Sequence, residues 1–287
     1  MLEDAIAVTR LRRAETMAKC MSGTAAKIIC ASLAKAELED SETYARVPLG
    51  YGDVDAWLHG GLRRGALHEI FAEGGHEAAA TGFTAALSFR VAADKRVLWI
   101  RQDFAAIECG DLAAIGLLEL GLDPARLLLL RLADVADVLR AASDALSCTA
   151  LGAVVIEILG NPKILDTVAS RRLTLASAEK GVTPFLLRFS AKPQVSTAET
   201  RWRVRAARSP DKKENWGSPV FETELVRSRH GQTGRWIMEW SCDDDLFQNP
   251  CDKRAKDSGI VVSPPCDRST AAAMEGVGGT QPIRRIV

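Results

Sequence analysis

The sequence predicts an α/β protein with a mostly parallel sheet flanked by helices, a helical arm before it and antiparallel strands after it. Two observations predict the parallel sheet: short, continuously apolar runs recur between residues 66 and 189, and segments with helical spacing separate them. A third observation predicts the antiparallel strands, because polar and apolar residues alternate with a period of two after Ser190.

Residues 1–45 are predicted to form the helical N-terminal arm. Between Arg10 and Lys35 the chain has six basic residues and one acid, and the run 37–42 then adds four acids. The apolar stripe of this region is weak, so two interpretations stay open: a solvated helix, or a helix that docks on a partner.

The core is predicted over residues 46–241. It begins with glycine-rich turns around a short helix at 53–58. Longer helices are predicted at 78–93, 109–120, 135–146 and 165–179. Buried strands are predicted at 66–72, 96–100, 126–132, 151–159 and 183–189, and half-buried strands at 201–207, 221–227 and 235–240. Residues 242–287 contain few large apolar side chains, so a disordered tail is predicted there.

The composition excludes several classes of protein. Lys plus Arg and Asp plus Glu number 37 each, and a net charge of zero excludes a uniformly basic nucleic-acid binder. No apolar run approaches the roughly 18 residues that cross a bilayer, and the N-terminus lacks the apolar segment of a secretory signal. We therefore expect a cytoplasmic protein without membrane contact. Seven cysteines without a CxxC pair, and four histidines not spaced as ligands, predict no disulfide framework and no metal site.

The connection at residues 72–83 lies where phosphate-binding loops occur, between the first strand of a parallel sheet and the helix that follows it. Gly74, Gly75 and Thr81 are the candidate residues of this degenerate loop. A working loop reads GxxxxGK followed by Ser or Thr, because the lysine reaches the β- and γ-phosphates.

That lysine is missing, since the sequence has none between Lys35 and Lys95. Glu73 and Glu77 would in addition repel a triphosphate. Glu157 ends an apolar strand at the position of a Walker B acid, and Asp103 lies where a water-activating residue would be expected. Without phosphate anchoring neither has a substrate, so we expect no catalysis and no bound ATP.

Residues 46–240 resemble the RecA-like ATPase core in the order and spacing of these features. The closer resemblance is to the ImuA family, RecA-like proteins of bacterial inducible-mutagenesis cassettes. It is carried by GGLRRGALHEIFA at 60–72, the lysine-free AATGF at 79–83 and STAETRWRVRAARS at 196–209. These motifs spread over about two thirds of the chain, and the resemblance fades after Trp240.

The resemblance implies a role in SOS-induced, error-prone translesion DNA synthesis. It implies as partners an ImuB-like adaptor of the Y family and an error-prone C-family polymerase, with RecA as a further candidate. Alternatives are an active ATPase that uses a basic residue from elsewhere, such as Arg63 or Arg64, a DNA-binding recombinase-like protein, and a SulA-like cell-division inhibitor.

Basic residues gather in the second half of the core. Residues 160–210 hold ten bases and three acids, whereas 97–159 hold four bases and nine acids. The candidate nucleic-acid or partner-binding residues are Lys192, Arg201, Arg203, Arg205 and Arg208. The strand arginines could track the phosphates of single-stranded DNA, form a solvated outer face, or pair with Glu222 and Glu224 on the next strand.

Overall fold

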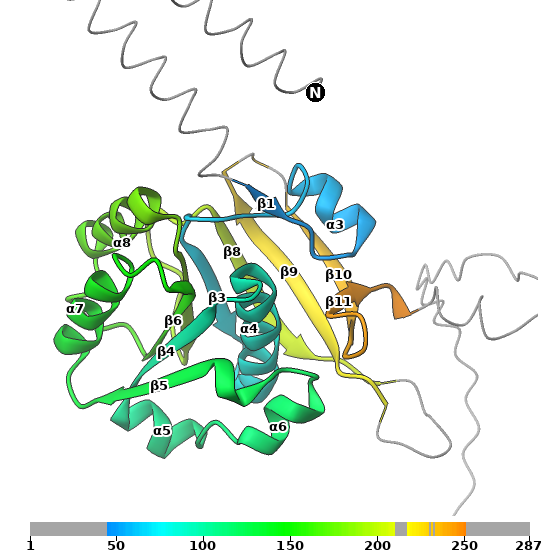
Figure 1. Cartoon of the computed structure of the whole chain (residues 1–287), viewed down its shortest axis with the longest axis horizontal. Helices are drawn as coiled ribbons and strands as arrows, with labels where there is room; N and C mark the ends of the chain where they lie inside the picture. Colours follow the sequence, from blue (N-terminus) through cyan, green and yellow to red (C-terminus); the bar gives the residue numbers. More distant parts are fainter. Residues whose placement is uncertain (1–44, 210–216, 230, 232, 251–287) are drawn as a thin grey trace, which may run out of the picture.

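The computed structural model describes residues 45–209, 217–229, 231 and 233–250 (Figure 1). The prediction of a helical arm therefore lies outside the described residues except for Ala45, and so does most of the predicted tail. None of the helices in the described ranges is long and apolar enough to cross a membrane.

A nine-stranded sheet forms the centre of the molecule, with the strand order β11-β10-β9-β8-β3-β7-β6-β4-β5. Its strands are β3 (His68–Ala72), β4 (Arg96–Gln102), β5 (Leu127–Leu132), β6 (Leu151–Leu159), β7 (Thr183–Phe189), β8 (Thr200–Ala206), β9 (Val220–Ser228), β10 (Gly234–Ser241) and β11 (Leu246–Gln248). The strands from β8 to β5 are parallel to their neighbours, and β8 to β11 are antiparallel. The predicted α/β fold with a mostly parallel sheet and C-terminal antiparallel strands is confirmed.

Helices cover both faces of the parallel part of the sheet (Figure 1). The helices of the described core are α3 (Gly52–Trp57), α4 (Glu77–Ala92), α5 (Asp103–Cys109), α6 (Ala114–Glu119), α7 (Val135–Ala145) and α8 (Thr167–Lys180), with a short 3-10 helix at Pro124–Arg126. The core under α4 includes Phe83, Trp99 and Trp202. The core of the opposite face, under α7 and α8, includes Ile156 and Leu173.

Two predictions about single elements are corrected by the structure. The helix predicted at 109–120 is α6 and begins only at Ala114, whereas α5, which was not predicted, precedes it and ends where Gly110 adopts a φ of 81°. The segment predicted as an antiparallel strand at 201–207 is β8, which pairs in parallel with β3 and antiparallel only with β9. It therefore joins the two halves of the sheet.

The sheet also extends beyond residue 241, where the core was predicted to end. β11 pairs with β10, and the Phe247 N–H donates to the Leu49 carbonyl at 2.9 Å. Phe247 is fully buried, so its ring holds this strand against the core. The residues around Phe247 are mostly polar, which is why the sequence did not predict a strand here. Residues 251–287 lie outside the described ranges.

A two-stranded sheet, β1 (Arg46–Val47) and β2 (Leu62–Arg63), lies with α3 at the start of the described core. Asp55 holds this segment together by accepting from the Leu49 and Gly50 N–H groups at 2.6 and 2.9 Å. A side chain at Gly61 would lie 2.1 Å from the Val47 carbonyl oxygen, so the close approach of the two strands requires glycine there.

Candidate functional site

The connection between β3 and α4 is a tight turn of four residues, 73–76. The His76 N–H donates to the Glu73 carbonyl at 2.9 Å, and Gly75 adopts a φ of 79°. Because the helices after β3 and β6 pack on opposite faces of the sheet, this turn lies where open parallel sheets bind ligands. The predicted loop is thus at the expected place in the fold.

Two side chains of this turn, Glu73 and His76, are bonded to the end of β8. Glu73 accepts from Arg205 at 2.5 Å, and the hydrogen bond from Arg205 holds the pKa of Glu73 below its usual value. The Ala206 N–H donates to His76 Nδ1 at 3.2 Å, so both ends of the turn are attached to the end of β8. The turn therefore places a carboxylate beside the N-terminus of α4, where a phosphate would bring further negative charge.

The N–H of Thr81 lies inside α4, so only the Thr81 hydroxyl could contact a ligand. The helix begins at Glu77, and only its first four residues have N–H groups without partners inside the helix. Thr81 is the fifth residue, and the acid Glu77 stands in the first turn. The missing lysine and the acids Glu73 and Glu77 would both disfavour the phosphates of a nucleoside triphosphate here.

Glu157 is buried, and both of its carboxylate oxygens are engaged. Trp99 Nε1 and Arg101 Nη2 each donate to one oxygen at 2.7 Å, from the neighbouring strand β4. Burial raises the pKa of Glu157, whereas Arg101 and the Trp99 N–H oppose that rise. The carboxylate at the Walker B position therefore belongs to a buried ion pair with Arg101.

A chain of further charges continues from this ion pair to the surface. Arg101 also contacts Asp111 at 3.4 Å, and Arg131 on β5 contacts Asp111 and Asp103 at 3.3 and 3.1 Å. Asp103, the candidate for activating water, is the first residue of α5 and is thus paired with Arg131.

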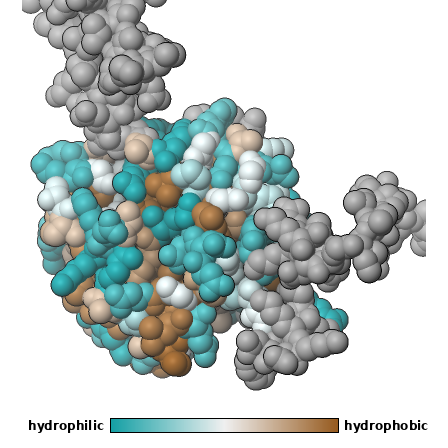
Figure 2. Space-filling model, turned by 45° about the vertical axis from the view of Figure 1, so that its right-hand side comes forward, coloured by the Kyte–Doolittle hydropathy of each residue, from teal (hydrophilic) through white to brown (hydrophobic). Residues whose placement is uncertain are grey.

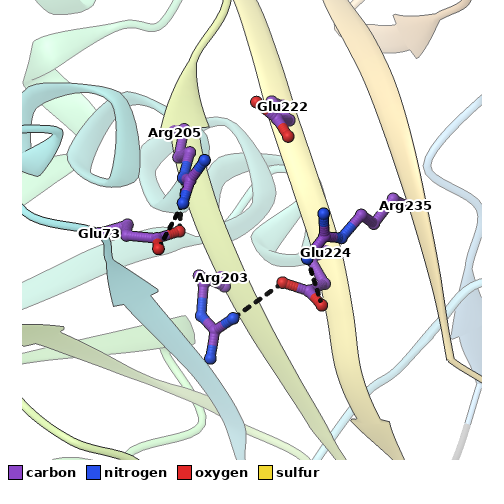
Figure 3. A pocket seen from close by; sticks show the side chains of 6 residues that line it. All are labelled: Glu73, Arg203, Arg205, Glu222, Glu224 and Arg235. Carbon is purple, nitrogen blue, oxygen red and sulfur yellow. Dashed lines mark hydrogen bonds and ion pairs between the residues drawn. The ribbon is translucent and has the colours of Figure 1, made fainter. Parts of the chain in front are cut away.

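Arg203 and Arg205 lie on β8 beside acidic residues of β9 and of the β3–α4 turn (Figure 3). We define this charged sheet face as Glu73, Arg203, Arg205, Glu222, Glu224 and Arg235. Glu224 accepts from Arg203 at 3.0 Å and from Arg235 at 3.1 Å, while Arg205 binds Glu73. Arg203 thus pairs with an acid of the next strand, as one interpretation of the sequence had it, whereas Arg205 pairs with Glu73 of the β3–α4 turn and not with Glu222.

The other predicted binding residues do not join one cationic row. Arg201 is 8% exposed, and its Nε donates to Glu69 at 2.7 Å beneath the surface. Lys192 is exposed in the β7–β8 connection, where its N–H donates to Asn161 Oδ1 at 2.8 Å. Arg208 follows the end of β8 and has a polar partner. Only Arg203 and Arg205 share the charged sheet face.

A hydrophobic surface that the sequence did not reveal covers the region of α5 and α6 (Figure 2). Its large exposed side chains are Phe104, Ile107, Ile115 and Leu118, which are 51 to 73% exposed. The adjacent strand β5 also exposes Leu128 and Leu129, which point to opposite faces of the sheet, and in the described residues no strand pairs with its outer edge. An unpaired edge beside exposed apolar side chains is typical of a protein-binding surface.

Among the described residues, no group of His, Cys, Asp and Glu is arranged to hold a metal ion. The fold and the β3–α4 turn together define an α/β protein of the parallel-sheet class whose phosphate-loop position carries acids and no lysine.

Comparison with known proteins gives the family. Protein ImuA of Caulobacter vibrioides strain NA1000 / CB15N is 33% identical to the chain over 198 residues, which cover 63% of this chain and 77% of that protein. Protein ImuA of strain ATCC 19089 / CIP 103742 / CB 15 of the same species matches to the same extent. No family model matches the chain. The chain belongs to the ImuA family, as its motifs indicate.

Proposed function

We propose that this protein is a non-catalytic, RecA-like accessory protein of SOS-induced, error-prone translesion DNA synthesis. Membership of the ImuA family supports the biological role. The non-catalytic part rests on one observation: the β3–α4 connection has no lysine, and it begins with a carboxylate, Glu73, that is already salt-bridged to Arg205.

The protein acts in this proposal as an interaction module. Its partners are an ImuB-like adaptor of the Y family and an error-prone C-family polymerase, with RecA as a further partner. The exposed apolar side chains of α5 and α6 beside the unpaired β5 edge support protein binding. Single-stranded DNA is a weaker candidate ligand, because Arg203 and Arg205 already have carboxylate partners.

The experiment compares nucleotide binding and hydrolysis in the purified chain and in Glu157→Gln. We expect ATP with magnesium to leave the melting temperature unchanged, since a ligand at one hundred times its dissociation constant would add about 2.7 kcal/mol. Glu157→Gln should melt at a lower temperature, because it leaves the buried Arg101 without its main counter-charge, at a cost of about 3 kcal/mol.

ATP hydrolysis well above the background of a mock preparation, abolished by Glu157→Gln in a variant that is still folded, would show an ATPase and overturn the non-catalytic assignment. A gene that lies beside and is co-transcribed with genes for a Y-family-like protein and a second C-family polymerase, under a damage-responsive promoter, is expected for the proposed role.

A further inference from the structure

Unpaired positive charge lies around α8, on the opposite face of the sheet from α4. The bases of β7 and β8 are buried or paired: Arg188 is buried and donates to the Gly160 carbonyl, and Arg201 pairs with Glu69. By contrast, four exposed side chains near α8 have no hydrogen bond or ion pair to any described residue: Lys163, Arg171, Arg172 and Lys192. The unpaired positive charge of residues 160–210 therefore lies at α8 and not on β8.

Large apolar side chains are exposed at the same place. Val168 and Leu175 on α8 are 56% and 62% exposed and lie seven residues apart, so they form one stripe on the outer side of the helix. Arg171 and Arg172 lie between them in sequence and project to either side of that stripe. Ile164 and Val195, in the two loops beside α8, are also exposed.

The two loops are fixed against the helix. Asn161 and Lys192 exchange two hydrogen bonds of 2.8 Å, which join the β6–α8 loop to the β7–β8 loop. Thr197 Oγ1 lies 2.7 Å from Thr174 Oγ1, so the second loop follows α8. We define the α8 surface as Lys163, Ile164, Val168, Arg171, Arg172, Leu175, Lys192 and Val195. It is held in place before any partner arrives.

The acids nearby do not neutralise this surface. Asp166 caps the N-terminus of α8 by accepting from the Ala169 N–H at 2.8 Å, and Glu179 pairs with Lys180 at 3.1 Å. The four cations named above keep their charge free for an external group. The α8 surface thus combines unpaired cations with an apolar stripe.

The exposed apolar groups of the α8 surface are aliphatic, which favours protein over nucleic acid. Single-stranded nucleic acids bind through aromatic platforms on which bases stack, and this surface has none. We propose that the α8 surface binds an acidic, amphipathic segment of a partner protein. Apolar side chains of that segment contact Val168 and Leu175, and its carboxylates pair with Arg171 and Arg172.

This binding surface goes beyond the proposed function and is separate from the hydrophobic surface of α5 and α6. The two surfaces share no residue, and Figure 1 places α8 and α6 far apart in the fold. If the α8 surface does not bind the peptides, the proposed function is therefore not contradicted, and the reverse also holds.

The test measures binding of the full chain to three fluorescent helical peptides of about five turns. All three peptides have leucines at the same helical spacing. The remaining positions are Glu in the first peptide, Gln in the second and Lys in the third, because these three residues have similar helix propensity. Fluorescence anisotropy at low and high salt gives the affinities, and an oligothymidylate serves as the nucleic-acid probe. We expect the glutamate peptide to bind about tenfold or more tightly than the glutamine peptide, with the difference lost at high salt.

Two double variants and a matched control locate the site. Arg171→Glu with Arg172→Glu should reverse the preference toward the lysine peptide, which also shows that the variant is folded. Val168→Ser with Leu175→Ser should weaken the binding of all three peptides. Arg140→Glu changes an exposed arginine of α7 and should have no effect.

Equal affinity for the three peptides, or no binding of the glutamate peptide, would overturn the proposal. Tighter binding of oligothymidylate that is lost in Arg171→Glu with Arg172→Glu would assign the surface to nucleic acid and overturn it as well. If Arg140→Glu weakens binding of the glutamate peptide as much as Arg171→Glu with Arg172→Glu does, the peptide is attracted by the overall charge of the protein. That result would also overturn the proposal of a specific site at α8.

Discussion

At the scale of single residues, His68 shows how neighbours fix the state of a buried polar group. It lies on β3 with no exposed surface, its Nε2 2.9 Å from the Arg63 carbonyl and its Nδ1 2.8 Å from Thr200 Oγ1. Because a carbonyl only accepts, Nε2 carries the hydrogen and Nδ1 accepts from the hydroxyl. Burial lowers the pKa of His68 to about 4, against the hydrogen bond to the carbonyl, which raises it.

This low pKa predicts a loss of stability in mild acid. The unfolded histidine takes up its proton near pH 6.5 and the folded one near pH 4, so the free energy of unfolding falls as the pH drops through that window. By pH 5 the loss from this group is about 2 kcal/mol. Urea unfolding at pH 8 and pH 5 should show this loss in the natural protein and not in His68→Gln. An identical pH dependence of the two proteins would contradict the assignment.

At the scale of elements, α4 and β6 pack unusually closely. A side chain at Gly152 on β6 would lie 2.4 Å from the Ala92 Cα, at the C-terminal end of α4. This contact helps set the position of α4, and with it the position of the β3–α4 turn.

Gly152→Ala should therefore destabilise the fold, because the added methyl group meets backbone atoms that cannot rotate away. We expect a loss of about 1–3 kcal/mol in the free energy of unfolding. Gly116→Ala is the matched control: it lies in α6 with open space around it and should be neutral or stabilising by up to about 1 kcal/mol. Chemical denaturation checks both, and equal stabilities for the two variants would show that the helix can shift at little cost.

At the scale of the whole molecule, charge and hydrophobicity are distributed unevenly over the surface. The charged sheet face is internally paired, free cations gather at α8, and exposed apolar side chains gather at α5 and α6. The last of these groups lies beside the unpaired edge of β5. A protein that binds different partners on different faces would have this distribution.

The hydrophobic surface yields a prediction about the proposed adaptor. Ile115→Asp with Leu118→Asp should weaken binding to a purified ImuB-like protein by about tenfold or more, because it places charge in an apolar contact. The melting temperature should hardly change, since both side chains are exposed. Ile237→Asp alters an exposed isoleucine on β10 and is the control. Unchanged adaptor binding in the double variant would move the partner to another surface.

Most of the fold could be predicted from the order of apolar runs. The strands predicted at 151–159 and 183–189 have the observed bounds of β6 and β7, and the helix predicted at 135–146 is α7 with one residue fewer. These elements are buried on one or both faces, and burial imposes a period that a sequence displays directly. The break between α5 and α6, and the short strand β11, were missed because each depends on one residue, Gly110 or Phe247.

Less of the candidate site was predictable. The sequence alone determined that the β3–α4 position lacks a lysine and carries acids, because that depends only on which residues are present. Only the tertiary structure decided what those charges do. It joins Glu73 to Arg205 and Arg201 to Glu69 across 132 residues of sequence, and Glu157 to Arg101 across 56. Pairing depends on distance in space and not along the chain. The structure was therefore needed to show that, within the described part of the chain, the arginines of β8 are paired and the cations at α8 are not.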